Sequence, residues 1–349
     1  ISDLYGKNLT YYEGTSQEVL SKIRLELNYS TVKNIDSLKD RLYTAKTDSI
    51  LVSDLIKEDL EEKYTDFSER TRVLKTIDIT KNVEDITKKV SIKNTSFNVL
   101  ISGMDSYGTI NKTTRNDVNM IATVNPNTNK VLLTSIPRDY YVQLHGKTGY
   151  KDKLTHAGIY GINTVVQTIE DLFGIDINYY VRVNFTTVES LVNTIGPIEI
   201  YSDKAMSLDG CKYVVCTNTV NGKCALRFAR ERHSYVEGDN HRIKNQQEVI
   251  KGIFNKLSKS AMVVTDYTSI LDSLDGKFAT NMDMKDITAF IKYELEDITK
   301  YEILDTQVTG TGSMELTYSY PHQKLYVMFP SEQSVESAKE YINKISNEK

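Results

Sequence analysis

Short apolar strands alternate with amphipathic helices along the middle of the chain, and this alternation restricts the possible folds more than any other feature. The run "FNVLIS" (97–102) ends at Gly103, as a buried strand does. The stretch "DVNMIATVNPNTNKVLLTSIP" predicts two strands joined by a turn at 126–129. In "AGIYGINTVVQTIEDLFG" the apolar residues recur at helical spacing until Gly174 stops the pattern. Interleaved strands and helices predict an α/β fold, in which helices flank a layered, mixed β-sheet.

The alternation continues beyond this helix. "IDINYYVRVNF" alternates like a strand, and Thr186 with Glu189 predicts the capping box of the next helix. Gly196 and Pro197 should end that helix, and "IEIY" should form the strand that follows.

The length of the chain indicates two domains, because 349 residues exceed what one hydrophobic core usually serves. The polar, lysine-rich run 81–96 marks the boundary. We therefore predict a small α+β accessory domain over 1–94 and a larger domain over 95–349. Within the first, "RVLKTIDI" (72–79) alternates like a strand.

Three helices are predicted in the accessory domain. Thr15 and Glu18 form a capping box for a helix whose apolar residues continue to Leu27. Asp36 should cap the second helix, and a third should cover about 53–64.

Composition limits the partners and the compartment. The formal net charge is -4, whereas nucleic-acid-binding domains are strongly basic, so nucleic acid is not an expected partner. No apolar run approaches the roughly 18 residues of a membrane span. The chain opens at Ile1 without a signal segment, and we expect an excised extracellular part. The three cysteines (Cys211, Cys216, Cys224) suit either one disulfide and a free thiol in an exported protein, or three buried thiols.

The hairpin around residues 126–129 makes a geometric prediction about charged residues. If Asn125 pairs with Lys130, then Asp117 faces Arg138 across the two strands. Asp105 lies just past the carboxyl end of the preceding strand, where ligands of α/β sheets commonly bind. Two carboxylates are thus expected at one edge of the sheet, beside arginines at positions 115 and 138.

Paired carboxylates of this kind suit a hard cation such as Mg²⁺, which takes one or two protein carboxylates and completes its shell with water and phosphate oxygens. The alternative is a structural ion pair between Asp117 and Arg138.

The stretch "CALRFARERHSYVEGDNHRIKNQ" concentrates positive charge in a chain that is acidic overall. We expect a helix capped by Asn221, in preference to a type I′ turn, that ends near Arg230. A second helix should begin at about Asn240, with Arg242 and Gln246 on one face near its amino end, where anions bind favourably. Arginines from both segments could neutralise a diphosphate, or they could form a solvated basic surface.

Seven stretches in order resemble the LytR-CpsA-Psr family, and most closely its streptococcal capsule-type members: "NVLISGMDS", "RNDVNMIATVNP", "VLLTSIPRDYYV", "KDKLTHAGIYG", "INYYVRVNF", "ALRFARERH" and "GDNHRIKNQQEVI". The similarity runs from about Phe97 to Leu257, and "YSYPHQKLYVMF" near the carboxyl end also fits. Residues 1–94 resemble the accessory domain that precedes the catalytic domain in capsule-type members.

The resemblance implies a phosphotransferase on the extracellular face of a Gram-positive, streptococcal-type cell membrane, held there by an anchor that this chain lacks. Such enzymes move a glycopolymer, here expected to be capsular polysaccharide, from a polyprenyl-diphosphate lipid carrier to a peptidoglycan hydroxyl. Two alternatives remain open: a pyrophosphatase that uses water as acceptor, and a non-enzymatic sensor of lipid-linked polymer that regulates capsule synthesis.

Carried over residue by residue, the resemblance implies that Asp105 and Asp117 hold Mg²⁺, or Mn²⁺ in its place. Asp139 and Asp239 would orient arginines. The side chains that would clamp the diphosphate are Arg115, Arg138, Arg230, Arg232, Arg242 and Gln246. Those expected to take part in catalysis are Asp105, Arg138, Arg230 and Arg242.

The sequence departs from the family pattern at two positions. Tyr107 stands where many relatives have arginine, which removes a phosphate contact expected from that loop. Asn116 replaces the usual serine of the "RSD" motif, a change that we expect to be harmless.

Overall fold

The computed structural model describes residues 6–13, 15, 17–23, 27–77, 84–108, 110, 113–235, 238–259, 269–270, 272–296 and 301–349. These residues belong to two compact units, of which the second is the larger. Unit 1 takes in Ile1–Glu84, Thr148–Asp152 and Met314–Tyr326, and unit 2 takes in Asp85–Lys147, Lys153–Ser313 and Val327–Lys349. The predicted domain boundary after residue 94 stays a prediction.

Unit 1 is built on a three-stranded parallel sheet in the order β2-β1-β3. Its strands are β1 (Asn8–Tyr12), β2 (Asn28–Val32) and β3 (Ser49–Leu51). Its helices are α1 (Gln17–Ser21), α2 (Ile35–Tyr43), α3 (Asp54–Lys63) and α4 (Phe67–Arg70). Because strands and helices alternate around a parallel sheet, this unit is of the α/β class rather than the predicted α+β class.

Of the helices predicted in unit 1, one is confirmed and two need correction in their details. Helix α3 is confirmed, and the hydroxyl of Ser53 caps it by accepting from the amide of Ile56. Asn34, not Asp36, caps α2, because its side chain accepts from the amide two residues later. Helix α1 ends at Ser21 rather than at Leu27.

The strand predicted over 72–79 is absent from 72–77, and its last residues lie outside the described part of the chain.

A segment from the far end of the chain completes the core of unit 1. Tyr320 is fully buried, its ring lies 6.2 Å from that of Tyr12, and its hydroxyl donates to Asp59. The neighbouring Ser319 bonds through its amide and its hydroxyl to Asp152, at 2.9 and 2.6 Å. Unit 1 is therefore assembled from three separate segments of the sequence.

Unit 2 is built on a six-stranded mixed sheet in the order β14-β9-β4-β5-β6-β15. Strands β4, β5 and β6 are antiparallel neighbours, whereas β9 and β15 lie parallel to β4 and β6. The strands are β4 (Phe97–Gly103), β5 (Val118–Asn125), β6 (Lys130–Ile136), β9 (Tyr179–Val183), β14 (Ala279–Thr280) and β15 (Glu302–Gln307). In the hairpin, Asn125 pairs with Lys130, so the predicted register is confirmed.

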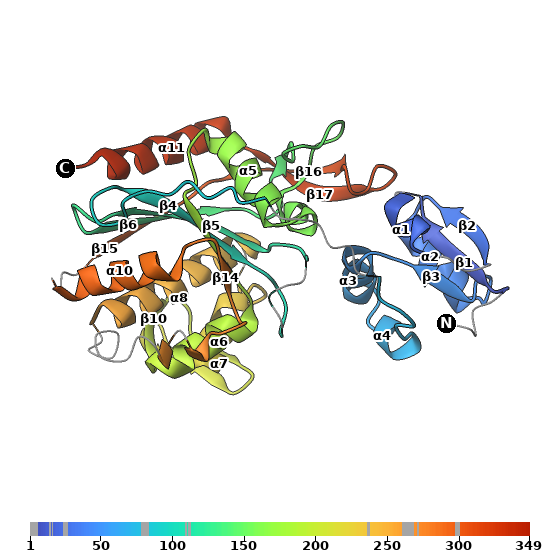
Figure 1. Ribbon diagram of the computed structural model, residues 1–349. Coiled ribbons are helices and arrows are strands. Elements are labelled where there is room, and N and C mark those ends of the chain that lie inside the picture. Colours follow the sequence, from blue (N-terminus) through green and yellow to red (C-terminus); the bar gives the residue numbers. More distant parts are fainter. Residues whose placement is uncertain are drawn as a thin grey trace. The chain divides into compact units, whose positions relative to one another are not determined.

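Helices cover both faces of this sheet, which confirms the predicted layered α/β class (Figure 1). Helices α5 (Ile162–Phe173) and α11 (Glu332–Asn347) pack on one face, on Leu100, Ile121 and Leu132. Helices α8 (Asp239–Lys259) and α10 (Met284–Glu296) pack on the other, where Phe290 meets Phe97 edge to face at 6.0 Å.

Below the sheet in Figure 1, a second cluster of apolar side chains joins α8 to two further helices, α6 (Phe185–Ile195) and α7 (Gly222–Arg230). Asn184 caps α6 together with Thr187, so the box predicted from Thr186 and Glu189 is wrong. Short hairpins accompany this cluster: β10 (Ile198–Ser202) with β13 (Cys216–Val220), and β11 (Met206–Leu208) with β12 (Cys211–Tyr213).

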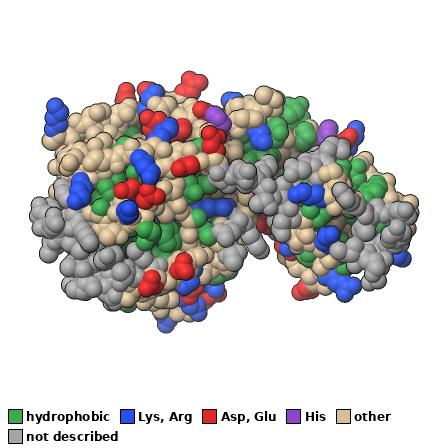
Figure 2. Space-filling model, viewed as in Figure 1, with side chains coloured by type: hydrophobic (Ala, Val, Ile, Leu, Met, Phe, Trp, Pro, Cys, Tyr) green, Lys and Arg blue, Asp and Glu red, His purple; other side chains and the backbone are tan. Residues whose placement is uncertain are grey.

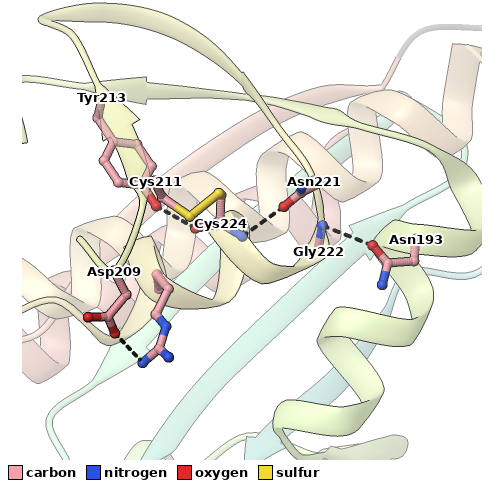
Figure 3. The surroundings of a disulfide bond; sticks show 8 residues. Asn193, Asp209, Cys211, Tyr213, Asn221, Gly222 and Cys224 are labelled. Carbon is pink, nitrogen blue, oxygen red and sulfur yellow. Dashed lines mark hydrogen bonds and ion pairs between the residues drawn. A yellow bond between two sulfur atoms is a disulfide. The ribbon is translucent and has the colours of Figure 1, made fainter. Parts of the chain in front are cut away.

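The amino end of α7 is fastened at several points (Figure 3). Asn221 accepts from the amide of Cys224 at 3.0 Å, which confirms the predicted cap. Cys224 forms a disulfide with Cys211, and Cys216 is an exposed free thiol, so one disulfide and one thiol is the state of the cysteines. Gly222 must be glycine, because a Cβ there would lie 2.4 Å from the carbonyl oxygen of Glu189.

The remaining elements connect these layers. They are β7 (Tyr141–Val142), β8 (Asp152–Lys153), the 3-10 helix η2 (Leu154–Tyr160), and the hairpin strands β16 (Gly310–Leu316) and β17 (Lys324–Pro330). In the part of the chain that the structure describes, no helix combines the length and the apolar composition needed to cross a bilayer.

Candidate functional site

The open end of the β5–β6 hairpin carries a buried ion pair. Asn119 pairs with Ile136, so the same register sets Asp117 opposite Arg138 just beyond the ladder. Arg138 Nη1 lies 2.8 Å from Asp117 Oδ2, and their side chains are 19% and 7% exposed. The other carboxylate oxygen accepts from Thr155 Oγ1 at 2.8 Å. The predicted contact is thus present, and it is buried rather than superficial.

Helix η2 holds the backbone on both sides of this pair. The amide of Thr155 donates to the carbonyl of Arg138 at 2.8 Å, and the amide of Asn116 donates to the carbonyl of Thr155 at 3.1 Å. Asn116 Oδ1 accepts from the amide of Gly158 at 2.8 Å. A Cβ on Gly158 would lie 2.4 Å from the carbonyl oxygen of Thr114, so only glycine permits this approach. Asn116 therefore anchors η2, which gives it a role that the sequence did not predict.

Asp105 is held on the loop that follows β4, and the amino end of α6 fixes this loop. The amide of Phe185 donates to the carbonyl of Ser106 at 3.0 Å, and the amide of Gly108 donates to Thr186 Oγ1 at 3.0 Å. From the last residue of α7, Arg230 Nη2 reaches to 3.5 Å from Asp105 Oδ1. The predicted end of this helix near Arg230 is confirmed, and it points the guanidinium at the loop.

The two aspartates have opposite pKa shifts. Burial alone would raise the pKa of Asp117, but the charges of Arg138, Arg115 and Arg242 and the Thr155 hydrogen bond outweigh it and lower that pKa. The pKa of Asp105 is raised, first by its partial removal from water and then by the negative charge of Asp117. The site thus pairs a firmly ionised carboxylate with a more basic one.

Four arginines contribute to these shifts, and they come from separate segments of the chain. Besides those already described, Arg242 is 7% exposed in the first turn of α8, and its charge acts on both aspartates. The described structure therefore brings together these predicted site residues: Asp105, Arg115, Asp117, Arg138, Arg230 and Arg242.

The other predicted residues have different surroundings. Asp139 lies 2.6 Å from Lys153 Nζ and 3.9 Å from Arg138 Nε, so a lysine absent from the prediction is its nearer partner. Arg232 donates to the neighbouring His233 at 3.4 Å. Gln246 is half-buried on α8, and no described contact joins it to the aspartates. Asp239 is the first residue of α8, and its side chain lies outside what the structure describes.

Figure 2 shows how charge is distributed on one face of unit 2. Acidic and basic side chains are interspersed there among the coloured atoms, instead of forming one broad field of a single sign.

Comparison with known proteins agrees with this geometry. The LytR_cpsA_psr family model matches residues 64–340, a range that includes every site residue named above. The chain belongs to this family. Two curated relatives carry the name polyisoprenyl-teichoic acid–peptidoglycan teichoic acid transferase TagU. The one from Enterococcus faecalis is 32% identical over 71% of this chain and 82% of its own length. The one from Bacillus subtilis is 34% identical over 65% and 72%.

Two solved structures share the fold. The protein Lin1025 from Listeria innocua superposes with a TM-score of 0.59 at 29% identity, covering 74% of this chain and all of that one. The crystal structure of Bacillus subtilis TagU gives a TM-score of 0.57 at 28% identity, with coverage of 73% and 99%. The predicted family is therefore confirmed, whereas the names of the two TagU sequence relatives mention teichoic acid and not capsule.

Proposed function

We propose that this protein transfers a glycopolymer from a polyprenyl-diphosphate carrier to a hydroxyl of peptidoglycan. The observation that supports it most strongly is the convergence of four arginines on the Asp105–Asp117 pair at one edge of the sheet. Guanidinium groups suit phosphate oxygens, because they donate paired, charge-assisted hydrogen bonds. The names of the TagU relatives describe the same class of transfer, from a polyisoprenyl-linked polymer to peptidoglycan.

In the proposed reaction, the acceptor oxygen attacks the phosphorus that carries the sugar. The bond from this phosphorus to the bridging oxygen breaks, polyprenyl phosphate leaves, and a phosphodiester joins the sugar to peptidoglycan. Negative charge builds up on the phosphoryl oxygens, and fixed arginines stabilise it without reorganising. With one of its oxygens left free by the metal, Asp105 would be the better proton acceptor for the attacking hydroxyl, since its pKa is raised while that of Asp117 is lowered.

Mg²⁺ fits the donor set of this site, and Mn²⁺ would be held by the same oxygens. The negative charge of Asp117 raises the pKa of Asp105, so the two carboxylates repel one another and a cation between them would be favoured. Among the described residues, no group of three or more His, Cys, Asp or Glu side chains could hold a metal. The ion would therefore rely on Asp105 and Asp117, and would supply charge neutralisation at the diphosphate.

We further propose that the reaction takes place outside the cell, at the surface of the membrane. The Cys211–Cys224 disulfide supports this, because such bonds persist in oxidising compartments. For the polymer we propose capsular polysaccharide, on the likeness of the sequence motifs to capsule-type members. Teichoic acid, the polymer in the names of the TagU relatives, is the competing donor in the test.

The test is an assay with purified protein, a short-chain polyprenyl-diphosphate oligosaccharide and peptidoglycan fragments. The Arg230→Ala variant should lose at least about a hundredfold in transfer, as expected for one fixed transition-state donor. Arg227→Ala is the matched control, because Arg227 lies on the same helix but pairs with Asp209 at 3.0 Å. Wild-type rates in Arg230→Ala would refute the clamp.

Three comparisons in this assay decide between the alternatives. Carrier cleavage that proceeds equally without acceptor would indicate a pyrophosphatase, and no turnover of any donor would favour a sensor. Donors built from capsule repeats and from teichoic acid, used side by side, identify the polymer. Removal of divalent ions by a chelator, followed by Mg²⁺ or Mn²⁺, tests the metal.

A further inference from the structure

Two aromatic rings stand beside the Asp105–Arg230 contact. Tyr107 lies two residues after Asp105, and 59% of its surface is exposed. Its ring meets the half-buried ring of Phe185 edge to face, with centroids 5.1 Å apart. The guanidinium carbon of Arg230 lies 4.1 Å from the centroid of the same Phe185 ring. Phe185 therefore contacts both an exposed tyrosine and the arginine that lies beside Asp105.

This aromatic pair is rigidly mounted. The backbone before and after Tyr107 is bonded to the first residues of α6 through Ser106 and Gly108. Asn184, the cap of that helix, adds a bond of 2.9 Å from its Nδ2 to the carbonyl of Gly108. An exposed aromatic ring can bury apolar surface when a ligand covers it, and rigid mounting lowers the entropic cost of such binding. Tyr107 thus has the properties of a binding residue and not of a core residue.

The position of the rings limits what they could bind. If Arg230 contacts the diphosphate, as proposed above, the groups nearest the rings are those attached to the diphosphate, a sugar on one side and an isoprenoid chain on the other. An isoprenoid requires a surface shielded from water, whereas Tyr107 is largely exposed and carries a hydroxyl. A pyranose ring combines an apolar face of C–H groups with polar hydroxyls at its edge, so a half-wet tyrosine suits it better.

We propose that Tyr107, backed by Phe185, binds the first sugar of the diphosphate-linked glycan and so contributes to donor selection. This inference rests on the proposed function, because the sugar is placed by its diphosphate. It assigns to Tyr107 a contact with substrate that is independent of the arginines.

The experiment measures binding by titration calorimetry with two probes, geranyl diphosphate and geranyl diphosphate carrying one N-acetylglucosamine. Tyr107→Ala should weaken binding of the sugar-bearing probe by about five- to tenfold and leave that of geranyl diphosphate within about twofold. Tyr107→Phe should bind both probes like the wild type. Tyr201→Ala removes a comparably exposed tyrosine on β10, at 53%, and should change neither affinity.

The outcomes separate this inference from the function on which it rests. If Tyr107→Ala weakens both probes equally, the ring contacts the diphosphate or the isoprenoid, and the inference is wrong while the function stands. If it weakens neither, the tyrosine does not bind substrate at all, and the inference is again wrong. If the wild-type protein binds neither probe, the proposed function fails and the sugar site with it.

Discussion

Replacement of Arg138 by alanine is the most direct test of the electrostatics of the site. The change leaves the carboxylate of Asp117, whose side chain is 7% exposed, without its contact at 2.8 Å. Breaking a buried ion pair from one side costs about 3–5 kcal/mol, because the remaining charge stays buried. Arg115 and Arg242 still lower the pKa of Asp117, and Arg138 itself is 19% exposed, so we expect the lower end, about 3 kcal/mol.

Hydrogen exchange measured by mass spectrometry suits this prediction, because it reports on one sheet in a chain of two units. The slowest amides of β5 and β6 exchange when that sheet opens. A loss of about 3 kcal/mol would speed their exchange by roughly a hundredfold or more at the same pH. Adding Asp117→Asn to Arg138→Ala removes the stranded charge and should recover at least about half of the loss.

The loss of stability in Arg138→Ala should also depend on pH. In the wild type the pKa of Asp117 in the folded protein lies below its unfolded value of about 3.9. The pair therefore contributes stability that is fully present above that unfolded value and is lost as the pH falls through the folded pKa. Without Arg138, the burial that raises the pKa of Asp117 is opposed only by Arg115, Arg242 and the Thr155 hydrogen bond, so this carboxyl should protonate at a higher pH in the variant than in the wild type. The variant should therefore approach the wild type in stability as the pH falls from 7 towards 4.5. A difference that stays constant over this range, or that remains below about 1 kcal/mol, would refute the reasoning.

Two further predictions concern the supports of the site. Thr155→Val removes the hydroxyl that donates to Asp117 at 2.8 Å, so it should lower the free energy of unfolding by about 1–3 kcal/mol and raise the pKa of that carboxyl. Thr155→Ser keeps a hydroxyl and should behave like the wild type. Equal exchange rates in β5 for all three proteins would contradict this prediction. The double change of Cys211 and Cys224 to serine opens a loop with a sequence separation of 13 and should cost about 3 kcal/mol, seen as faster exchange in α7. Cys216→Ser is its control, since that thiol is free, and unchanged exchange in the double variant would show that the disulfide contributes no stability.

The register of the β5–β6 hairpin was predictable from the sequence, because it depends only on local pairing. Once Asn125 pairs with Lys130, every other pair in the ladder follows, and Asp117 must face Arg138. The same holds for the ends of α7, since Asn221 and the polar stretch after Arg230 mark them directly. In both places the deciding residues lie along one hairpin or one helix, so the sequence pattern alone was sufficient.

Helix caps were predicted less well, because several side chains compete for each one. Near the start of α6, Asn184 and Thr186 both have an oxygen that could accept from the helix amides. Asn184 caps the helix because its backbone is extended, with φ of -134°, and because its Nδ2 also bonds to the carbonyl of Gly108. That second bond reaches a residue 76 positions away, which no local pattern reveals.

Long-range contacts also explain why the sequence missed the residues that support the site. Thr155 bonds to Asp117 across 38 positions, and Phe185 reaches Tyr107 only because α6 begins beside the loop after β4. A threonine or a phenylalanine in a helical stretch looks the same whether it packs in the core or touches a functional residue. Charged residues can be picked out by type, whereas the side chains that orient them require the fold.

The acidic chain and the basic site are consistent once charge is counted locally. The formal net charge of -4 argues against a partner that covers a large surface, but a diphosphate linked at both ends has only two negative charges. The described groups around the two carboxylates leave two positive charges in excess, because four arginines stand against two aspartates, and the neighbouring Asp139 and Lys153 cancel one another: Arg115, Arg138, Arg230 and Arg242, with Asp105 and Asp117. A bound divalent cation would raise that excess and strengthen the hold on the diphosphate. Chelation should therefore weaken binding of geranyl diphosphate carrying one N-acetylglucosamine without removing it, because the excess positive charge of the arginines already matches the two negative charges of that probe.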